Sequence, residues 1–74
     1  MQVIKFANIE TAFTSRITKK YKIKIIQYDD GVYVVVFRKY FSDEEECSLS
    51  FSDSYVELEK AQNKFDFYVK LATR

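Results

Sequence analysis

The chain has 74 residues, of which 47% are hydrophobic and 18% aromatic, and its 12 basic and 11 acidic residues give a net charge of +1. This length allows a single domain over residues 1–74, and the abundance of aromatic residues excludes a disordered chain. The nearly balanced charge excludes a global attraction to nucleic acid or to anionic membranes, so any electrostatic preference must come from local clustering.

The first twenty residues allow two structural interpretations. Phe6, Ile9, Phe13 and Ile17 recur at intervals of three or four residues, which is typical of an amphipathic helix. Against this, several Thr and Ser residues, which form helices poorly, interrupt the segment, and residues 3–6 are compatible with a strand. We expect a helix here, with a strand as the alternative.

Two β-rich runs, residues 21–28 and 32–41, flank the sequence Asp-Asp-Gly at residues 29–31. Two aspartates followed by a glycine suit a three-residue hairpin loop in which the glycine adopts a positive φ. Gly31 is the only glycine of the chain, as expected for a position where a Cβ would be strained. The sequence therefore predicts an antiparallel hairpin.

The loop also predicts which side chains of the hairpin share a face, because side chains alternate along a strand. The predicted register pairs Ile25 with Val35. One face then carries a core made of Tyr21, Ile23, Ile25, Tyr33, Val35 and Phe37. The opposite face carries apolar residues near the turn and three basic residues, Lys22, Lys24 and Arg38, at the far end.

The last third of the chain predicts a strand and then a helix. Residues 46–51 alternate between polar and apolar types, which indicates a third antiparallel strand with Cys47 buried as a structural thiol. Ser54 and Glu57 have the spacing of a helix capping box. A stripe at helical spacing follows, formed by Leu58, Ala61, Phe65, Tyr68, Val69 and Ala72. The predicted fold is α+β, with a three-stranded antiparallel sheet against a long C-terminal helix and a further helix at the N-terminus (α-β-β-β-α).

Several chemistries are improbable on composition alone. The chain has no histidine, the commonest general base and metal ligand, and one glycine cannot form a phosphate-binding loop. Glutamates directly before Cys47 oppose a reactive thiolate. We therefore expect no enzyme, and no catalytic, cofactor-binding or metal-binding residues. The single cysteine and the short apolar runs, the longest at residues 32–37, lead us to expect a cytoplasmic protein without a membrane partner.

Apolar residues outside the predicted core indicate a protein-binding surface, because exposed apolar patches usually mark interfaces. The predicted contact residues are Ile26, Tyr28, Val34, Val36, Phe67 and Leu71. The expected partner is another protein or a second copy of the chain in a homodimer. The alternative is that the N-terminal segment covers one of these patches.

Basic residues converge at the open end of the predicted hairpin, with Tyr21 and Tyr40 among them. They are Lys19, Lys20, Lys22, Lys24, Arg38 and Lys39. Basic residues interleaved with aromatic ones suit a platform for single-stranded nucleic acid. The alternative is a solvated sheet edge that discourages aggregation.

The predicted order of helix, three strands and helix with charged turns, over residues 6–74, resembles that of some anti-CRISPR proteins, which phages and mobile elements encode. The resemblance implies an inhibitor of a bacterial defence protein. It also implies a set of acidic contacts, namely Asp29, Asp30, Asp43, Glu44, Glu45 and Glu46. A net charge of +1 favours steric occlusion over mimicry of phosphates. The favoured function is thus a small non-catalytic protein-binding module, and the alternative is single-stranded nucleic-acid binding.

Overall fold

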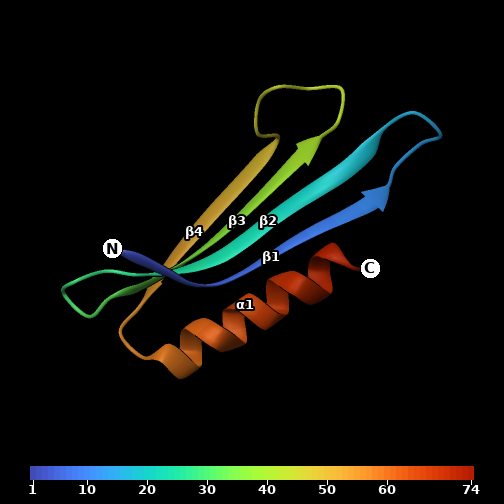
Figure 1. Cartoon of the computed structure of the whole chain (residues 1–74). Coiled ribbons are helices and arrows are strands. Elements are labelled where there is room, and N and C mark those ends of the chain that lie inside the picture. Colours follow the sequence, from blue (N-terminus) through green and yellow to red (C-terminus); the bar gives the residue numbers. More distant parts are fainter.

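A computed structural model describes all 74 residues as a sheet of four antiparallel strands followed by one helix (Figure 1). The elements are β1 (Gln2–Ala12), β2 (Thr18–Gln27), β3 (Tyr33–Phe41), β4 (Leu49–Tyr55) and α1 (Leu58–Ala72). The strands lie in the order β1-β2-β3-β4, so each pairs with its neighbour in the sequence. The helix lies across one face of this sheet (Figure 1).

The predicted N-terminal helix, and with it the α-β-β-β-α layout and the three-stranded sheet, is wrong. The segment forms β1, which pairs with β2 along its length and has one irregularity between Val3 and Lys5. Ala7 and Ile9 are half-buried against the core. Phe6, which lies between this irregularity and Ala7, is exposed. Burial along the strand therefore has a period of two. The helix-like spacing arose because Phe6 and Ile9 occupy opposite faces of β1, while Phe13 and Ile17 lie in the loop that follows it.

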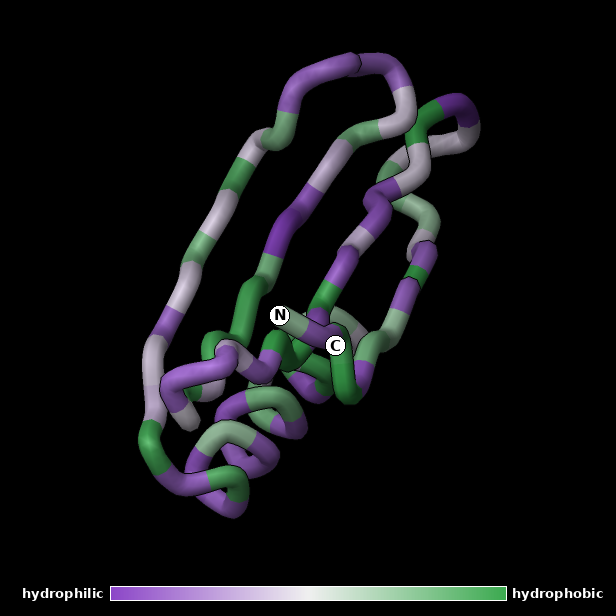
Figure 2. The backbone as a smooth tube through the Cα atoms, turned by 60° about the vertical axis from the view of Figure 1, so that its left-hand side comes forward, coloured by the Kyte–Doolittle hydropathy of each residue, from purple (hydrophilic) through white to green (hydrophobic).

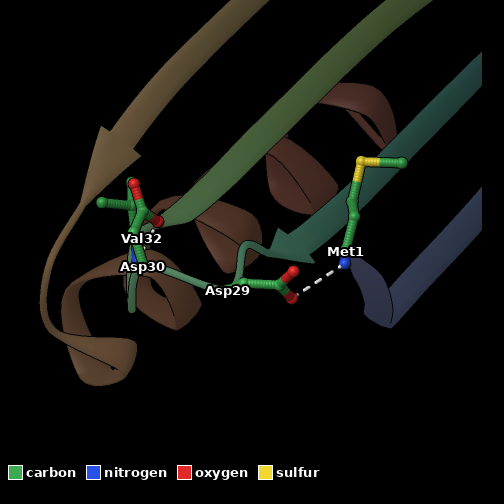
Figure 3. Close-up of polar contacts among 4 residues, drawn as sticks. All are labelled: Met1, Asp29, Asp30 and Val32. Atoms are coloured by element: carbon green, nitrogen blue, oxygen red, sulfur yellow. Dashed lines mark hydrogen bonds and ion pairs between the residues drawn. The ribbon is translucent and has the colours of Figure 1, made fainter.

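The β2–β3 hairpin confirms the predicted loop. Gly31 has a φ of +85°, the left-handed region that favours glycine. Its N–H donates to the carbonyl of Tyr28 at 3.0 Å, and the N–H of Tyr28 donates to the carbonyl of Val32 at 2.9 Å. The side chain of Asp30 accepts a hydrogen bond from the N–H of Val32 at 3.2 Å (Figure 3). Turn chemistry and strand pairing therefore agree on one register.

The core lies between α1 and the face of the sheet that it covers. The predicted register is confirmed, since Ile25 pairs with Val35 and Ile23 with Phe37, and these four side chains are fully buried. The buried cluster comprises Tyr21, Ile23, Ile25, Val35, Phe37, Ala61, Phe65, Tyr68 and Ala72. Burying each large apolar side chain contributes about 1.5–3 kcal/mol.

Strand β4 and helix α1 both start later than predicted. Residues before Leu49 belong to the β3–β4 loop, so Cys47 is exposed and not buried. Ser54 is paired within β4 and caps nothing, because the ladder with β3 continues past it. The helix begins at Leu58, and Glu57 at its N-cap makes no side-chain capping bond. Of the predicted stripe, Ala61, Phe65, Tyr68 and Ala72 are buried and Val69 is half-buried against the core, whereas Leu58 is exposed. This helix is neither long nor apolar enough to cross a membrane.

One hydrogen bond ties the edge strand β4 to α1. The hydroxyl of Tyr68 donates to Oδ2 of Asp53 at 2.6 Å. Burial, and then the hydrogen bond and the negative charge of Asp53, raise the pKa of Tyr68 above its ordinary value of about 10. Tyr68 also stacks on Phe37, with ring centroids 4.8 Å apart, so the bond anchors the helix at the centre of the core.

We predict that Ile23→Ala lowers the free energy of unfolding by about 2–5 kcal/mol, because it leaves a cavity in the core. Val56→Ala is the control, since Val56 is 78% exposed and surface truncations change stability by about 0.5 kcal/mol or less. Urea denaturation followed by circular dichroism measures both. Equal losses for the two variants would contradict the described core.

The raised pKa of Tyr68 predicts a pH dependence of stability. Above about pH 10 the unfolded state loses this proton while the folded state keeps it, so the stability contributed by Tyr68 falls as pH rises. The difference in unfolding free energy between the parent and Tyr68→Phe should therefore be constant from pH 7 to 9. It should then shrink towards pH 11. A difference that is flat or grows across this range would contradict the assigned shift.

Candidate functional site

Helix α1 covers one face of the sheet and leaves the other, here called the open face, without a covering element (Figure 1). Directly paired residues of antiparallel strands point to the same side, so the register defines this face. The strands alternate hydrophobic and hydrophilic residues along much of their length (Figure 2). The open face carries Val3, Phe6, Asn8 and Glu10 of β1, Lys20, Lys22, Lys24 and Ile26 of β2, Val34, Val36, Arg38 and Tyr40 of β3, and Ser50, Ser52 and Ser54 of β4.

The six basic residues expected to bind nucleic acid divide between the two faces. Four lie together on the open face, namely Lys20, Lys22, Lys24 and Arg38. Lys19 and Lys39 lie on the side of the helix, where their Nζ atoms are 5.8 Å and 5.1 Å from the ring centroids of Phe13 and Phe41. The alternation of the strands therefore separates a set that looked continuous in the sequence.

Positive charge on the open face is largely unpaired. Lys20 lies 3.9 Å from Glu10, the one acidic residue of this face, and both side chains are largely exposed. Lys22, Lys24 and Arg38 take part in no ion pair. Because the whole chain has a net charge of +1, this excess is a local property of the open face.

Two aromatic side chains flank these cations. Tyr40 is half-buried beside Lys22, whose Nζ lies 5.5 Å from the centroid of the tyrosine ring. Phe6 is 69% exposed. Sequence reasoning placed Tyr40 near the basic residues but missed Phe6 and Asn8, because it assigned both to a helix. The signal that could have found them is the alternation of a strand, in which Phe6 and Asn8 lie on one face and the half-buried Ala7 and Ile9 lie on the other.

The predicted apolar contact residues lie on opposite sides of the molecule. Ile26 and Val36 are on the open face but buried, and Val34 beside them is half-buried. Neighbouring side chains of the same face, including Val3 opposite Ile26, leave them little surface. Tyr28 is exposed at the β2–β3 turn. This part of the prediction therefore yields no large exposed patch on the sheet.

Phe67 and Leu71 remain exposed on α1, the former by 50%. They border a hollow of about 330 Å³ between the edge strand and the helix, which we call the β4–α1 groove. Its lining residues are Phe51, Ser52, Asp53, Lys64, Phe67, Tyr68 and Leu71. Apart from Ser52 at the sheet edge, these residues belong to α1 or to the helix side of β4, so the groove lies on the other side of the sheet from the basic residues of the open face.

The acidic residues singled out in the sequence do not form one surface. Asp29 and Asp30 lie at the β2–β3 turn, where Asp29 pairs with the amino group of Met1 at 3.1 Å (Figure 3). Residues 43–46 lie in the β3–β4 loop, at the opposite end of β3. A strand of nine residues separates the two groups by about 30 Å. Nowhere do three acidic or cysteine side chains come together as a metal site.

Comparison of the chain with known protein families, with curated proteins and with solved structures found no match.

Proposed function

We propose that the protein binds single-stranded nucleic acid on the open face of its sheet. The observation that carries this proposal is the gathering, on three adjacent strands, of unpaired cations and two aromatic side chains, the exposed Phe6 and the half-buried Tyr40. Lys22, Lys24 and Arg38 form no ion pair, and Phe6 and Tyr40 lie at the margins of the same patch. Positive grooves combined with aromatic platforms are typical of proteins that bind single strands.

The spacing of the cations suits a phosphate backbone. Lys20, Lys22 and Lys24 occupy every second position of β2, so the distance between the Cα atoms of consecutive lysines is about 7 Å. Arg38 lies directly opposite Lys22 on β3. Each of the three lysines can therefore meet a different phosphate of a strand that runs along β2, and Arg38 adds positive charge beside them. Neutralising phosphates releases condensed counterions, which is the main source of affinity for such sites.

The shape of the open face favours single strands over duplexes. The face is a sheet surface without a helix on it (Figure 1), so it presents no element to enter the major groove of a duplex. Unpaired bases can instead lie flat on exposed rings such as that of Phe6. At the β4 side of the open face, Ser50, Ser52 and Ser54 have short, polar side chains that project little from the sheet.

Protein binding is the second candidate, and the β4–α1 groove favours it. Phe51, Phe67 and Leu71 are exposed around the groove, and β4 is an edge strand whose outer edge is unpaired. A partner protein or a second copy of the chain could add to this edge. Inhibition of a bacterial defence protein by occlusion belongs to this candidate. The helix, three-strand, helix order that carried the resemblance to anti-CRISPR proteins is not the observed order.

Nucleic-acid binding predicts a defined salt dependence. If three to four phosphates are contacted, the logarithm of the association constant for a 20-nucleotide oligothymidylate should fall with the logarithm of salt concentration with a slope of about −2 to −3. The double variant Lys22→Gln, Lys24→Gln should bind more weakly and reduce the magnitude of this slope by about 1.4. Fluorescence anisotropy between 50 and 200 mM NaCl measures both quantities.

The matched control is Lys60→Gln, Lys70→Gln, which removes the same charge from α1 on the other side of the sheet. It should leave affinity and slope unchanged. Undetectable binding by the parent at 50 mM NaCl, or equal weakening in the two double variants, would refute the proposal.

Protein binding through the groove predicts that Phe67→Glu abolishes association while the helical circular dichroism signal stays the same, because Phe67 is exposed and outside the core. Sedimentation over a hundredfold range of protein concentration tests self-association. Pull-down from a bacterial lysate tests association with another protein. A parent chain that sediments as a monomer and captures nothing would exclude this second candidate.

A further inference from the structure

A hollow of about 260 Å³ lies on the open face, among the unpaired cations. Two cross-strand rows of side chains form most of its lining. One row is Phe6, Lys24 and Val36, and the next is Asn8, Lys22 and Arg38. The hollow therefore combines an exposed aromatic ring, an apolar floor at Val36, and polar groups at its margin.

We propose that this hollow holds one unpaired base of the bound strand, stacked on Phe6 and hydrogen-bonded at its edge by Asn8 and Arg38. The inference rests on the proposed function, and it adds a residue-level source of base preference. It assigns different roles to neighbouring side chains. Lys20, Lys22 and Lys24 contact phosphates, whereas Phe6, Asn8 and Arg38 contact the base.

The lining of the hollow favours a base over other ligands, and its volume of about 260 Å³ is sufficient for one small ring system. A phosphate alone would gain little from the ring of Phe6 or from the apolar floor. An aliphatic chain would leave the polar groups of Asn8 and Arg38 without partners, which is unfavourable once water is excluded.

Asn8 is free to read the edge of a base. Its side chain makes no hydrogen bond within the chain, and a carboxamide offers two donors and an acceptor. The guanidinium of Arg38 offers donors only. Single-stranded nucleic acid exposes the hydrogen-bonding edges of its bases to such groups. A base within a duplex is stacked and paired, so it cannot enter the hollow.

Phe6 supplies the platform. Its ring is more exposed than that of any other aromatic residue of the chain, and it projects from β1 beside the cations of β2. Covering such a ring with a base removes apolar surface from water on both partners. The preceding irregularity in β1, between Val3 and Lys5, lies at the same end of the hollow.

Abasic oligonucleotides test this inference separately from the phosphate contacts. Fluorescence anisotropy would compare decathymidylate with a decamer of the same phosphate backbone that lacks bases. The parent should bind decathymidylate at least tenfold more tightly than the abasic decamer. Phe6→Leu should reduce that ratio about fivefold or more and leave affinity for the abasic decamer unchanged, because stacking on one aromatic ring accounts for at least this factor.

Asn8→Ala should change the ranking of the four homopolymeric decamers of T, C, A and G. The ratio between the tightest and the weakest decamer should fall about fivefold or more, with the salt slope unchanged. Phe67→Leu is the matched control for Phe6→Leu, since it makes the same substitution at an exposed phenylalanine on α1. This control should leave every affinity as in the parent.

The possible failures can be told apart. Equal affinity of the parent for decathymidylate and the abasic decamer would overturn the base-binding hollow and leave the phosphate contacts standing. Unchanged ratios in both Phe6→Leu and Asn8→Ala, or equal effects of Phe6→Leu and Phe67→Leu, would likewise overturn it. Absence of binding to all decamers would overturn this inference together with the proposed function.

Discussion

The antiparallel register between β2 and β3 is the constraint on which both sides of the molecule depend. Ile25 and Val35 pair under α1, so the residues next to them, Lys24 and Val36, must point to the opposite face. A slip of one residue would place lysines under the helix without partners, at a large cost in desolvation. The apolar packing that stabilises the fold therefore also assembles the cations of the open face.

Strand β1 completes this face. It contributes half-buried Ala7 and Ile9 to the core side and Phe6 and Asn8 to the open side. Without it, the cations of β2 would lie on an exposed sheet edge, where charged residues commonly serve to prevent aggregation. With it, they lie in the interior of a four-stranded sheet between two other strands. An interior position with an adjacent ring and amide is better suited to hold a ligand than to protect an edge.

The parts of the fold that could be predicted are those with local signals. Gly31 and the alternation on both sides of it define the hairpin, and the helical stripe around Phe65 defines the buried face of α1. For the N-terminal segment a strand was only the alternative to a helix, because the spacing of its apolar residues fits both and its state is decided by pairing with the edge of β2. The predicted start of α1 was wrong for a related reason. Ser54 has the sequence of a helix cap, but pairing with β3 keeps it in the sheet.

The residues of the candidate site also divide into those with local sequence signals and those whose positions depend on non-local pairing. The hairpin register was enough to predict that Lys22, Lys24 and Arg38 share a face, and the structure brings them together with Lys20. The positions of Phe6 and Asn8 on this face could not be inferred, because they depend on non-local pairing of β1. The acidic residues looked like one group in composition, yet the length of β3 separates them.

The central claim is that nucleic acid occupies the open face, and methyl resonances report on it directly. Titration of a ¹³C-methyl-labelled chain with oligothymidylate should shift the methyl signals of Val3, Val34 and Val36 on the open face. The signals of Leu49, Leu58 and Leu71 should stay in place, since Leu58 and Leu71 belong to α1 and Leu49 to the helix side of β4. Shifts confined to the leucines, or no shifts at low salt, would contradict the account.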